Sequence, residues 1–242
     1  MTSRVNIPIL MYHSIEKMPK SVLMRSMHVP PNRFNFQMWL LKILGYKGLS
    51  IKEIKPFLDG EKQGKVVGIT FDDGYQNNLK NVAPILRKYG FSATCYIVSD
   101  CIGSFNSWDF DKGLPKLPLM DKSDIKKWLE YGMDIGAHSK SHIDLTQINK
   151  KDLIKEISSC KEDLEKLFNV EVTDFCYPYG RFNEFVCKQT ERAKFITATT
   201  MNRGKAQSHS SKFMLPRIPI NHHTLPHLFL TKILTNYELG KK

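Results

Sequence analysis

The chain has 242 residues, of which 41% are hydrophobic, so it is long enough to bury one large core and we expect a single domain. Lys and Arg number 36 against 24 Asp and Glu, and the formal net charge of +12 favours anionic partners. The basic residues are dispersed in runs of at most two and are not interleaved with aromatic residues. This distribution argues against nucleic acid as a partner and predicts that most of the lysines form an ordinary solvated surface. An anionic membrane surface and a phosphorylated or acidic sugar stay as candidate partners.

Cysteine usage and the N-terminus bear on the compartment. Five cysteines, an odd number with no C-x-x-C pair, argue against a disulfide framework. The first apolar stretch, residues 7–12, is short and contains Pro8, so it does not have the form of a signal peptide, and no stretch approaches the length of a membrane span. We therefore expect a cytoplasmic protein, although a chain from which a leader had been cleaved would have the same pattern.

Strand-like and helix-like segments alternate along the chain. In chain order we predict strand 7–12, helices 34–44 and 49–58, strand 66–71, helix 78–89, strand 93–98, a helix capped by Ser123, a strand ending at His138, helix 151–168, strand 174–177, helix 184–192 and strand 195–199. In helix 151–168 the predicted buried stripe consists of Leu153, Ile154, Ile157, Leu164 and Leu167. About seven strands in this alternation predict an α/β fold, a distorted (β/α)7-type barrel with its active residues at the carboxyl ends of the strands.

Two connections are longer than an ordinary loop. Residues 16–32 contain three prolines and are a candidate flap, and residues 99–120 are a candidate binding element. The second connection carries Trp108 and Asp109. Trp108 fits either a platform on which a sugar stacks or an aromatic plug that holds the loop down.

The most informative stretch is the apolar run 66–71, which stops at Asp72, Asp73 and Gly74. Adjacent carboxylates in a mostly buried site repel each other unless a cation or a shared proton is present. A second strand-like run ends at His138, with His142 four positions later. Asp73 and the two histidines suit a catalytic zinc site with one open position, which leaves Asp72 free to act as a base. The alternatives are a solvated Asp-Asp-Gly turn and a surface histidine pair.

These motifs resemble those of a known family. The stretches that carry the resemblance are Thr70-Phe71-Asp72-Asp73-Gly74, His138-Ser139-x-x-His142, Phe175-Cys176-Tyr177-Pro178-Tyr179-Gly180, and, for a subgroup, Ile9-Leu10-Met11-Tyr12-His13-Ser14-Ile15 and Asn106-Ser107-Trp108-Asp109. They resemble the polysaccharide deacetylase family (NodB homology domain, carbohydrate esterase family 4), in the subgroup of biofilm-polysaccharide deacetylases. The resemblance implies one domain over residues 1–242, with 1–64 as an N-terminal extension packed on the barrel.

The resemblance also implies roles for individual residues. Asp73, His138 and His142 are the expected metal ligands, for Zn²⁺ by preference, with Co²⁺, Ni²⁺ or Mn²⁺ as fitting alternatives. Asp72 is the expected base, and the backbone N–H of Tyr179 is expected to stabilise an oxyanion. Trp108, Asp109 and Tyr179 are the expected substrate-binding residues.

Two positions depart from the family pattern. Cys176 stands where many relatives have the arginine that orients the base, and Arg217 is our candidate replacement, with a buried salt bridge elsewhere as its alternative role. The leaving-group acid is the second open position, for which His13, His222 and His223 are all candidates.

These observations predict a metal-dependent hydrolase that removes N-acetyl groups from the amino sugars of a polysaccharide or a glycoconjugate precursor. Two alternatives stay open: a deformylase or other amidase of a lipid-linked amino sugar, and a catalytically inactive glycan- or nucleic-acid-binding module. The expected partners are an N-acetylated amino-sugar glycan or a carrier-linked precursor, and an anionic membrane surface.

Overall fold

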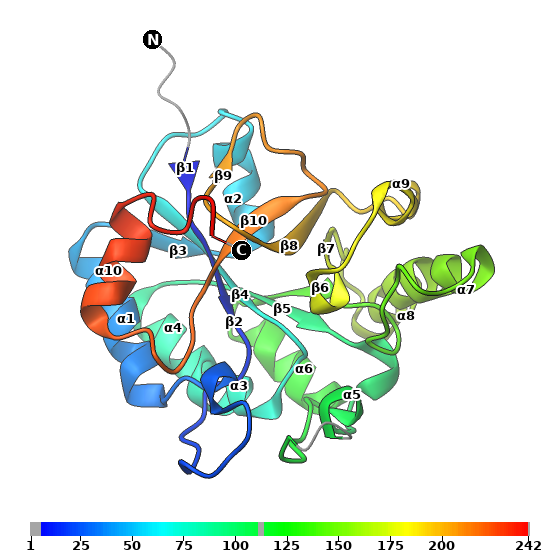
Figure 1. The fold of residues 1–242 in the computed structure, drawn as a ribbon, viewed down its shortest axis with the longest axis horizontal. Coiled ribbons are helices and arrows are strands. Elements are labelled where there is room, and N and C mark those ends of the chain that lie inside the picture. Colours follow the sequence, from blue (N-terminus) through cyan, green and yellow to red (C-terminus); the bar gives the residue numbers. More distant parts are fainter. Residues whose placement is uncertain (1–5, 111–113, 242) are drawn as a thin grey trace.

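Seven parallel strands close into a barrel in the computed structural model, which describes residues 6–110 and 114–241 (Figure 1). The ring runs β2-β10-β8-β7-β6-β5-β4 and closes where β4 pairs with β2, with Tyr12 opposite Phe71. The predicted distorted (β/α)7-type barrel is thereby confirmed. The seven strands of the ring are β2 (Ile9–Tyr12), β4 (Val66–Phe71), β5 (Thr94–Ile97), β6 (Asp134–Ala137), β7 (Asp174–Cys176), β8 (Thr197–Arg203) and β10 (Leu215–Pro219).

Three short strands lie outside the ring. β1 (Asn6–Ile7) pairs antiparallel with β9 (Ala206–Gln207), and β3 (Lys47–Leu49) runs parallel to the first half of β4. Residues 1–64, which we expected to form an extension packed on the barrel, thus also supply β2, a strand of the ring itself.

Helices cover the outside of the ring (Figure 1). They are α1 (Pro31–Ile43), α2 (Ile51–Leu58), α3 (Gln76–Asn81), α4 (Ala83–Tyr89), α5 (Ser107–Phe110), α6 (Lys122–Glu130), α7 (Lys150–Ile154), a π-helical stretch (Lys155–Ser159), α8 (Cys160–Phe168), α9 (Glu184–Arg192) and α10 (Pro226–Leu234), with 3-10 turns at Arg25–Met27, Ser99–Cys101 and Pro178–Gly180. Among the described residues no helix is both long enough and apolar enough to cross a bilayer.

Several predicted boundaries are wrong. The helix predicted over 49–58 begins later, because Leu49 belongs to β3 and Ser50 caps α2 by accepting from the backbone N–H of Glu53. The helix predicted over 78–89 is two helices, since Pro84 has no N–H with which to continue α3. Asp121, rather than Ser123, caps α6 by accepting from the N–H of Asp124.

The buried stripe predicted for helix 151–168 is partly wrong. Leu153, Ile157 and Leu164 are buried, but Ile154 is 41% exposed and Leu167 is 36% exposed. The buried positions 153, 157, 160 and 164 follow spacings of four, three and four, and Cys160 completes that face. Ile154 lies outside this sequence of spacings and faces away from the core. Leu167 continues the sequence with a spacing of three, but it lies in the last turn of α8 and is only partly covered.

Large side chains lie in the barrel interior. Tyr96 and Arg217 are both buried there, with the guanidinium 5.8 Å from the centre of the tyrosine ring. Gly136 makes room for Tyr96, because a Cβ at position 136 would lie 2.5 Å from that ring. Tyr96 therefore packs against the guanidinium of Arg217 inside the barrel, and the guanidinium reaches Asp72 at the carboxyl end of β4.

Two acidic side chains lie at the opposite end of the barrel, where β6 and β7 begin, and of these Asp174 is buried and Asp134 is half-buried. Asp174 accepts hydrogen bonds from the hydroxyls of Thr197 (2.6 Å) and Thr173 (3.0 Å). Asp134 has a pKa raised to about 7 by burial and by the neighbouring charge of Asp174. This end of the barrel lies outside the predicted site, but the raised pKa of Asp134 predicts that its ionisation lowers stability as pH rises.

Candidate active site

The residues singled out by sequence lie together at the carboxyl ends of the barrel strands. Asp72 and Asp73 follow β4, His138 follows β6, and His13 follows β2. They line a cavity of about 250 Å³, together with Trp108, Asp109, His142, Tyr177 and Tyr179. Of the candidate leaving-group acids, His13 lines this cavity, whereas His222 and His223 lie outside its lining.

Asp73, His138 and His142 form a compact and buried set of donors. Asp73 Oδ1 lies 3.4 Å from His138 Nε2 and 3.3 Å from His142 Nε2. Two ligands about 2.0–2.1 Å from a tetrahedral ion are themselves about 3.3–3.4 Å apart, so this spacing suits a zinc-sized cation. One oxygen and two imidazole nitrogens leave room for a further ligand, as catalytic zinc sites require.

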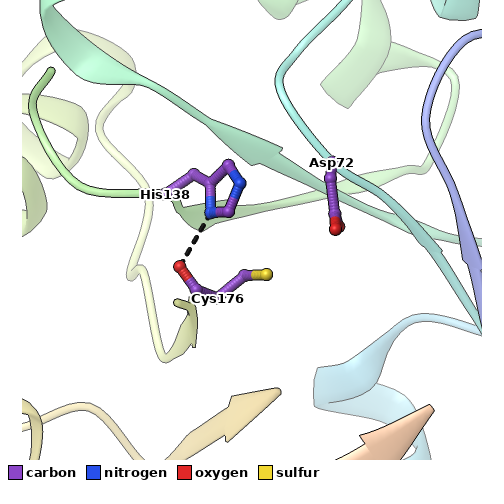
Figure 2. Close-up of side chains that lie close together, drawn as sticks. All are labelled: Asp72, His138 and Cys176. Atoms are coloured by element: carbon purple, nitrogen blue, oxygen red, sulfur yellow. Dashed lines mark hydrogen bonds between the residues drawn. The ribbon is translucent and has the colours of Figure 1, made fainter. Parts of the chain in front are cut away.

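A second set of donors shares His138, namely Asp72, His138 and Cys176 (Figure 2). His138 Nδ1 is already engaged, because it lies 2.7 Å from the carbonyl oxygen of Cys176 and donates its proton there (Figure 2). That bond fixes the tautomer so that Nε2, which faces Asp73, carries the free lone pair. Arg217 also places a positive charge 3.2 Å from the Cys176 sulfur. Both observations favour the set that contains Asp73.

The backbone around the site is strained. Asp73, Ser139, His142 and Tyr179 all have φ between 58° and 74°, in the left-handed region that residues with a Cβ rarely adopt. Such conformations persist where the surrounding structure holds them and are concentrated at functional sites. In the turn that contains Ser139 and His142, the N–H of His142 donates to the hydroxyl of Ser139 at 3.0 Å, which holds the loop between the two histidines.

Arg217 forms a two-pronged ion pair with Asp72. Nη1 donates to Oδ1 at 2.7 Å and Nη2 donates to Oδ2 at 2.8 Å. Three further bonds hold the guanidinium, to Thr70 Oγ1 (3.0 Å), the carbonyl of Thr200 (2.9 Å) and Cys176 Sγ (3.2 Å). Burial alone would raise the pKa of Asp72, but the charge and hydrogen bonds of Arg217 outweigh it and the pKa is lowered. Asp72 is therefore a carboxylate of fixed orientation.

His13 stands on the other side of the same carboxylate. Its Nε2 lies 3.9 Å from Asp72 Oδ2, and its side chain is about one-fifth exposed to the cavity. Asn78 donates to the backbone carbonyl of His13 at 2.8 Å and so fixes the end of β2. The geometry gives His13 access both to solvent and to the centre of the cavity.

Trp108 lies against a predicted metal ligand. Its indole is stacked on the ring of His142, with centroids 4.2 Å apart and an angle of 19° between the planes. The ring of Tyr179 meets His142 edge-on at 4.7 Å. One face of Trp108 is therefore occupied by protein, and the indole also borders a second, more open groove lined by Ser141, Asp144 and Arg181.

Sequence reasoning missed several residues around the cavity. Thr70 and Thr200 hold Arg217, and only the exact strand register places them there. Met24, Met27 and Met201 also line the cavity. No periodicity marks the first two, because they lie in the irregular connection between β2 and α1.

Comparison with known proteins identifies the family of the chain. Residues 59–198 match the family model described as polysaccharide deacetylase. YxkH of Bacillus subtilis strain 168 is 29% identical over 217 residues, which cover 89% of this chain and 71% of that protein. The poly-beta-1,6-N-acetyl-D-glucosamine N-deacetylase of Staphylococcus aureus strain MRSA252 is 27% identical over 213 residues, which cover 83% and 70%. The solved structure of Streptococcus pyogenes deacetylase PplD in complex with acetate superposes with a TM-score of 0.82 at 27% identity, covering 96% of this chain and 99% of that one.

Proposed function

We propose that this chain, which belongs to the polysaccharide deacetylase family, is a metal-dependent hydrolase that removes N-acetyl groups from the amino sugars of a glycan. The observation that carries the proposal is the juxtaposition of a buried Asp73–His138–His142 donor set with a second carboxylate, Asp72, that Arg217 holds ionised. A fixed base beside a cation site in a cavity is an arrangement that can hydrolyse an amide.

The donors Asp73, His138 and His142 would hold a divalent ion, Zn²⁺ by preference, with Co²⁺, Ni²⁺ or Mn²⁺ suited to the same ligands. When bound, such an ion supplies Lewis-acid polarisation of an amide carbonyl and makes water more acidic. The hydrogen bond from His138 Nδ1 to the carbonyl of Cys176 orients the imidazole for this task.

The remaining steps fall to side chains and one backbone group of this chain. Asp72 accepts the proton of the attacking water, and Arg217 keeps the carboxylate ionised and oriented. The backbone N–H of Tyr179 donates to the oxygen on which negative charge develops. His13, which is near Asp72 and open to the cavity, gives its proton to the departing amine, so that acetate and a free amino sugar leave.

The relatives support a proposal for the substrate class. One of them is named as acting on poly-beta-1,6-N-acetyl-D-glucosamine, and we propose for this chain an N-acetylglucosamine oligomer or its carrier-linked precursor. The open groove beyond Trp108 leaves space for a sugar next to the one that reacts. An anionic membrane that presents a carrier-linked substrate would complement the net charge of +12.

The test is release of acetate from N-acetylglucosamine oligomers by the metal-supplemented protein, with Asp72→Asn as the matched variant. We expect release by the wild type and a fall of at least about 100-fold in kcat for Asp72→Asn, since it retains shape but cannot take a proton. Equal rates in the two proteins would contradict the assignment of the base. No release from any N-acetylated glycan, with metal bound, would contradict the substrate class.

A further inference from the structure

The two histidines of the donor set are held in different ways. His138 Nδ1 donates to the carbonyl of Cys176, so a protein partner fixes that imidazole. His142 Nδ1 is buried, and within the part of the chain that the structure describes no group forms a hydrogen bond with it. An imidazole without such a partner depends on its backbone and on ring contacts for its orientation. The contacts that hold the backbone of residues 138–142 therefore bear directly on the donor set.

Glu156 holds the backbone of this loop. Its Oε2 accepts from two successive N–H groups, those of Lys140 (2.9 Å) and Ser141 (3.0 Å). Its Oε1 accepts from the hydroxyl of Ser141 at 2.7 Å. A carboxylate that accepts from consecutive N–H groups forms charge-assisted hydrogen bonds, which are stronger than those between neutral groups. One side chain thus binds the centre of the loop through three hydrogen bonds.

The conformation that Glu156 holds is a strained one. Ser139 and His142, on either side of the two bonded N–H groups, have φ of 61° and 58°, in the left-handed region. Residues with a Cβ rarely adopt this conformation, and it persists only where surrounding contacts hold it. Loss of the Glu156 carboxylate would therefore let the loop relax and move His142 relative to Asp73.

The helix that carries Glu156 faces the loop at three positions. Glu156 lies in the π-helical stretch between α7 and α8, and π-helical turns are rare and frequent at functional sites. Cys160 and Asp163 follow at spacings of four and three. Cys160 Sγ donates to the carbonyl of Ser139 at 3.0 Å. Asp163 pairs with the ammonium group of Lys140. Of these three positions, Glu156 is the one whose side chain reaches the N–H groups of the loop.

We propose that Glu156 is a positioning residue for the metal centre, because it holds the loop that sets the position of His142 against Asp73. The inference rests on the proposed function, since it concerns the same centre. Glu156 does not line the active-site cavity, so its effect reaches the centre through the loop. This role is one of shape, and a neutral side chain of the same shape should fill it. The amide oxygen of a glutamine can accept from both N–H groups, while its NH₂ donates to the hydroxyl of Ser141.

The test measures the affinity for Co²⁺, by competition with a chelating dye, and the visible absorption of bound Co²⁺, which reports the coordination geometry. Glu156→Ala should bind Co²⁺ about 30-fold more weakly than the wild type and with an altered spectrum. Glu156→Asp keeps the charge but not the reach and should resemble Glu156→Ala. Glu156→Gln keeps the reach but not the charge, and it should stay within about fivefold of the wild type and keep its spectrum.

Two outcomes of this comparison would overturn the proposal. Wild-type affinity in Glu156→Ala and Glu156→Asp would show that the loop holds His142 without the carboxylate. Wild-type affinity in Glu156→Asp together with a loss in Glu156→Gln would show that the charge of Glu156 acts on the ion and that its shape does not matter.

Glu165 provides a matched control on α8. Its Oε1 accepts from the backbone N–H of Val172 at 3.0 Å and pairs with Lys161 at 2.9 Å, so it too fixes a backbone segment through a carboxylate. Val172 lies just before β7, at the amino end of that strand, and outside the donor set. Glu165→Ala should keep the Co²⁺ affinity and spectrum of the wild type. Equal losses of affinity in Glu165→Ala and Glu156→Ala would show a general effect of stability and would overturn the assignment.

A measurement on the metal-free protein separates this inference from the proposed function. Amide hydrogen exchange at Lys140 and Ser141 should be at least about tenfold faster in Glu156→Ala than in the wild type, because these N–H groups lose their acceptor. Unchanged exchange would overturn the proposal whatever the result for acetate release. No acetate release by the wild type, with the expected differences in exchange and Co²⁺ affinity, would contradict the proposed function alone. A wild type that bound no Co²⁺ would overturn both.

Discussion

Replacement of Arg217 by methionine should damage both stability and catalysis, because the guanidinium is the partner of a buried base. Arg217 is 1% exposed and makes two bonds to Asp72, of 2.7 and 2.8 Å. Removal of one member of a buried ion pair leaves the other charge unpaired, at a loss of about 3–5 kcal/mol of unfolding free energy. We expect Arg217→Met to lose this amount in urea denaturation and to reduce kcat/KM about 100-fold, since the carboxylate loses its orientation.

A double-mutant cycle separates the pair from its surroundings. Asp72→Asn alone leaves the guanidinium unpaired, but in the double variant neither charge remains, so the coupling energy should reach about 2 kcal/mol or more. Lys232 provides a matched control, because it is buried, pairs with Glu238 and does not line the active-site cavity. Lys232→Met should lose about as much unfolding free energy as Arg217→Met. At temperatures below its unfolding transition it should keep the kcat/KM of the wild type. An additive cycle, or similar activities for Arg217→Met and Lys232→Met, would refute this reasoning.

Three further predictions concern other groups. Trp108→Ala should weaken zinc binding about tenfold in competition with a chelating dye, because the indole supports the ring of His142; an increase in KM alone would make Trp108 a sugar platform instead. Zinc at 100 times its Kd should stabilise the wild type by about 2.7 kcal/mol in thermal unfolding, and Asp73→Asn should abolish this gain. The folded-state pKa of Asp134 is raised to about 7, so the folded protein is destabilised by the ionised form of this side chain. This loss of stability is absent below about pH 4, where Asp134 is protonated in both states, and it grows as pH rises to 7. Asp134→Asn should therefore stabilise by about 1–4 kcal/mol at pH 8 and much less at pH 4, whereas exposed Glu191→Gln should show no such difference; equal effects at both pH values would contradict this.

The site residues that could be predicted from the sequence are those that directly follow a strand. Asp72, Asp73 and His138 follow apolar runs, and parallel strands bring their carboxyl ends to one edge, so their convergence follows from the alternation of elements. The family prediction is confirmed by the match over residues 59–198. The individual roles of the site residues stay predictions.

Other features depend on tertiary structure that spacing does not encode. The contact between Arg217 and Asp72 joins residues 145 apart in sequence, and the only sequence signal for it is the cysteine at position 176, where many relatives have an arginine. β3 was missed because three residues are too few for a period, and α10 because its apolar residues form a nearly continuous run rather than a stripe.

The most direct test of the proposed centre measures metal content and acetate release together in the wild type, His142→Gln and Cys176→Ala. The two donor sets share His138 but differ in these residues. If Asp73, His138 and His142 hold the metal, Cys176→Ala should retain one ion and most of its activity, and His142→Gln should lose both. Loss of the ion in Cys176→Ala, with retention in His142→Gln, would contradict the proposed centre and place the metal beside Asp72.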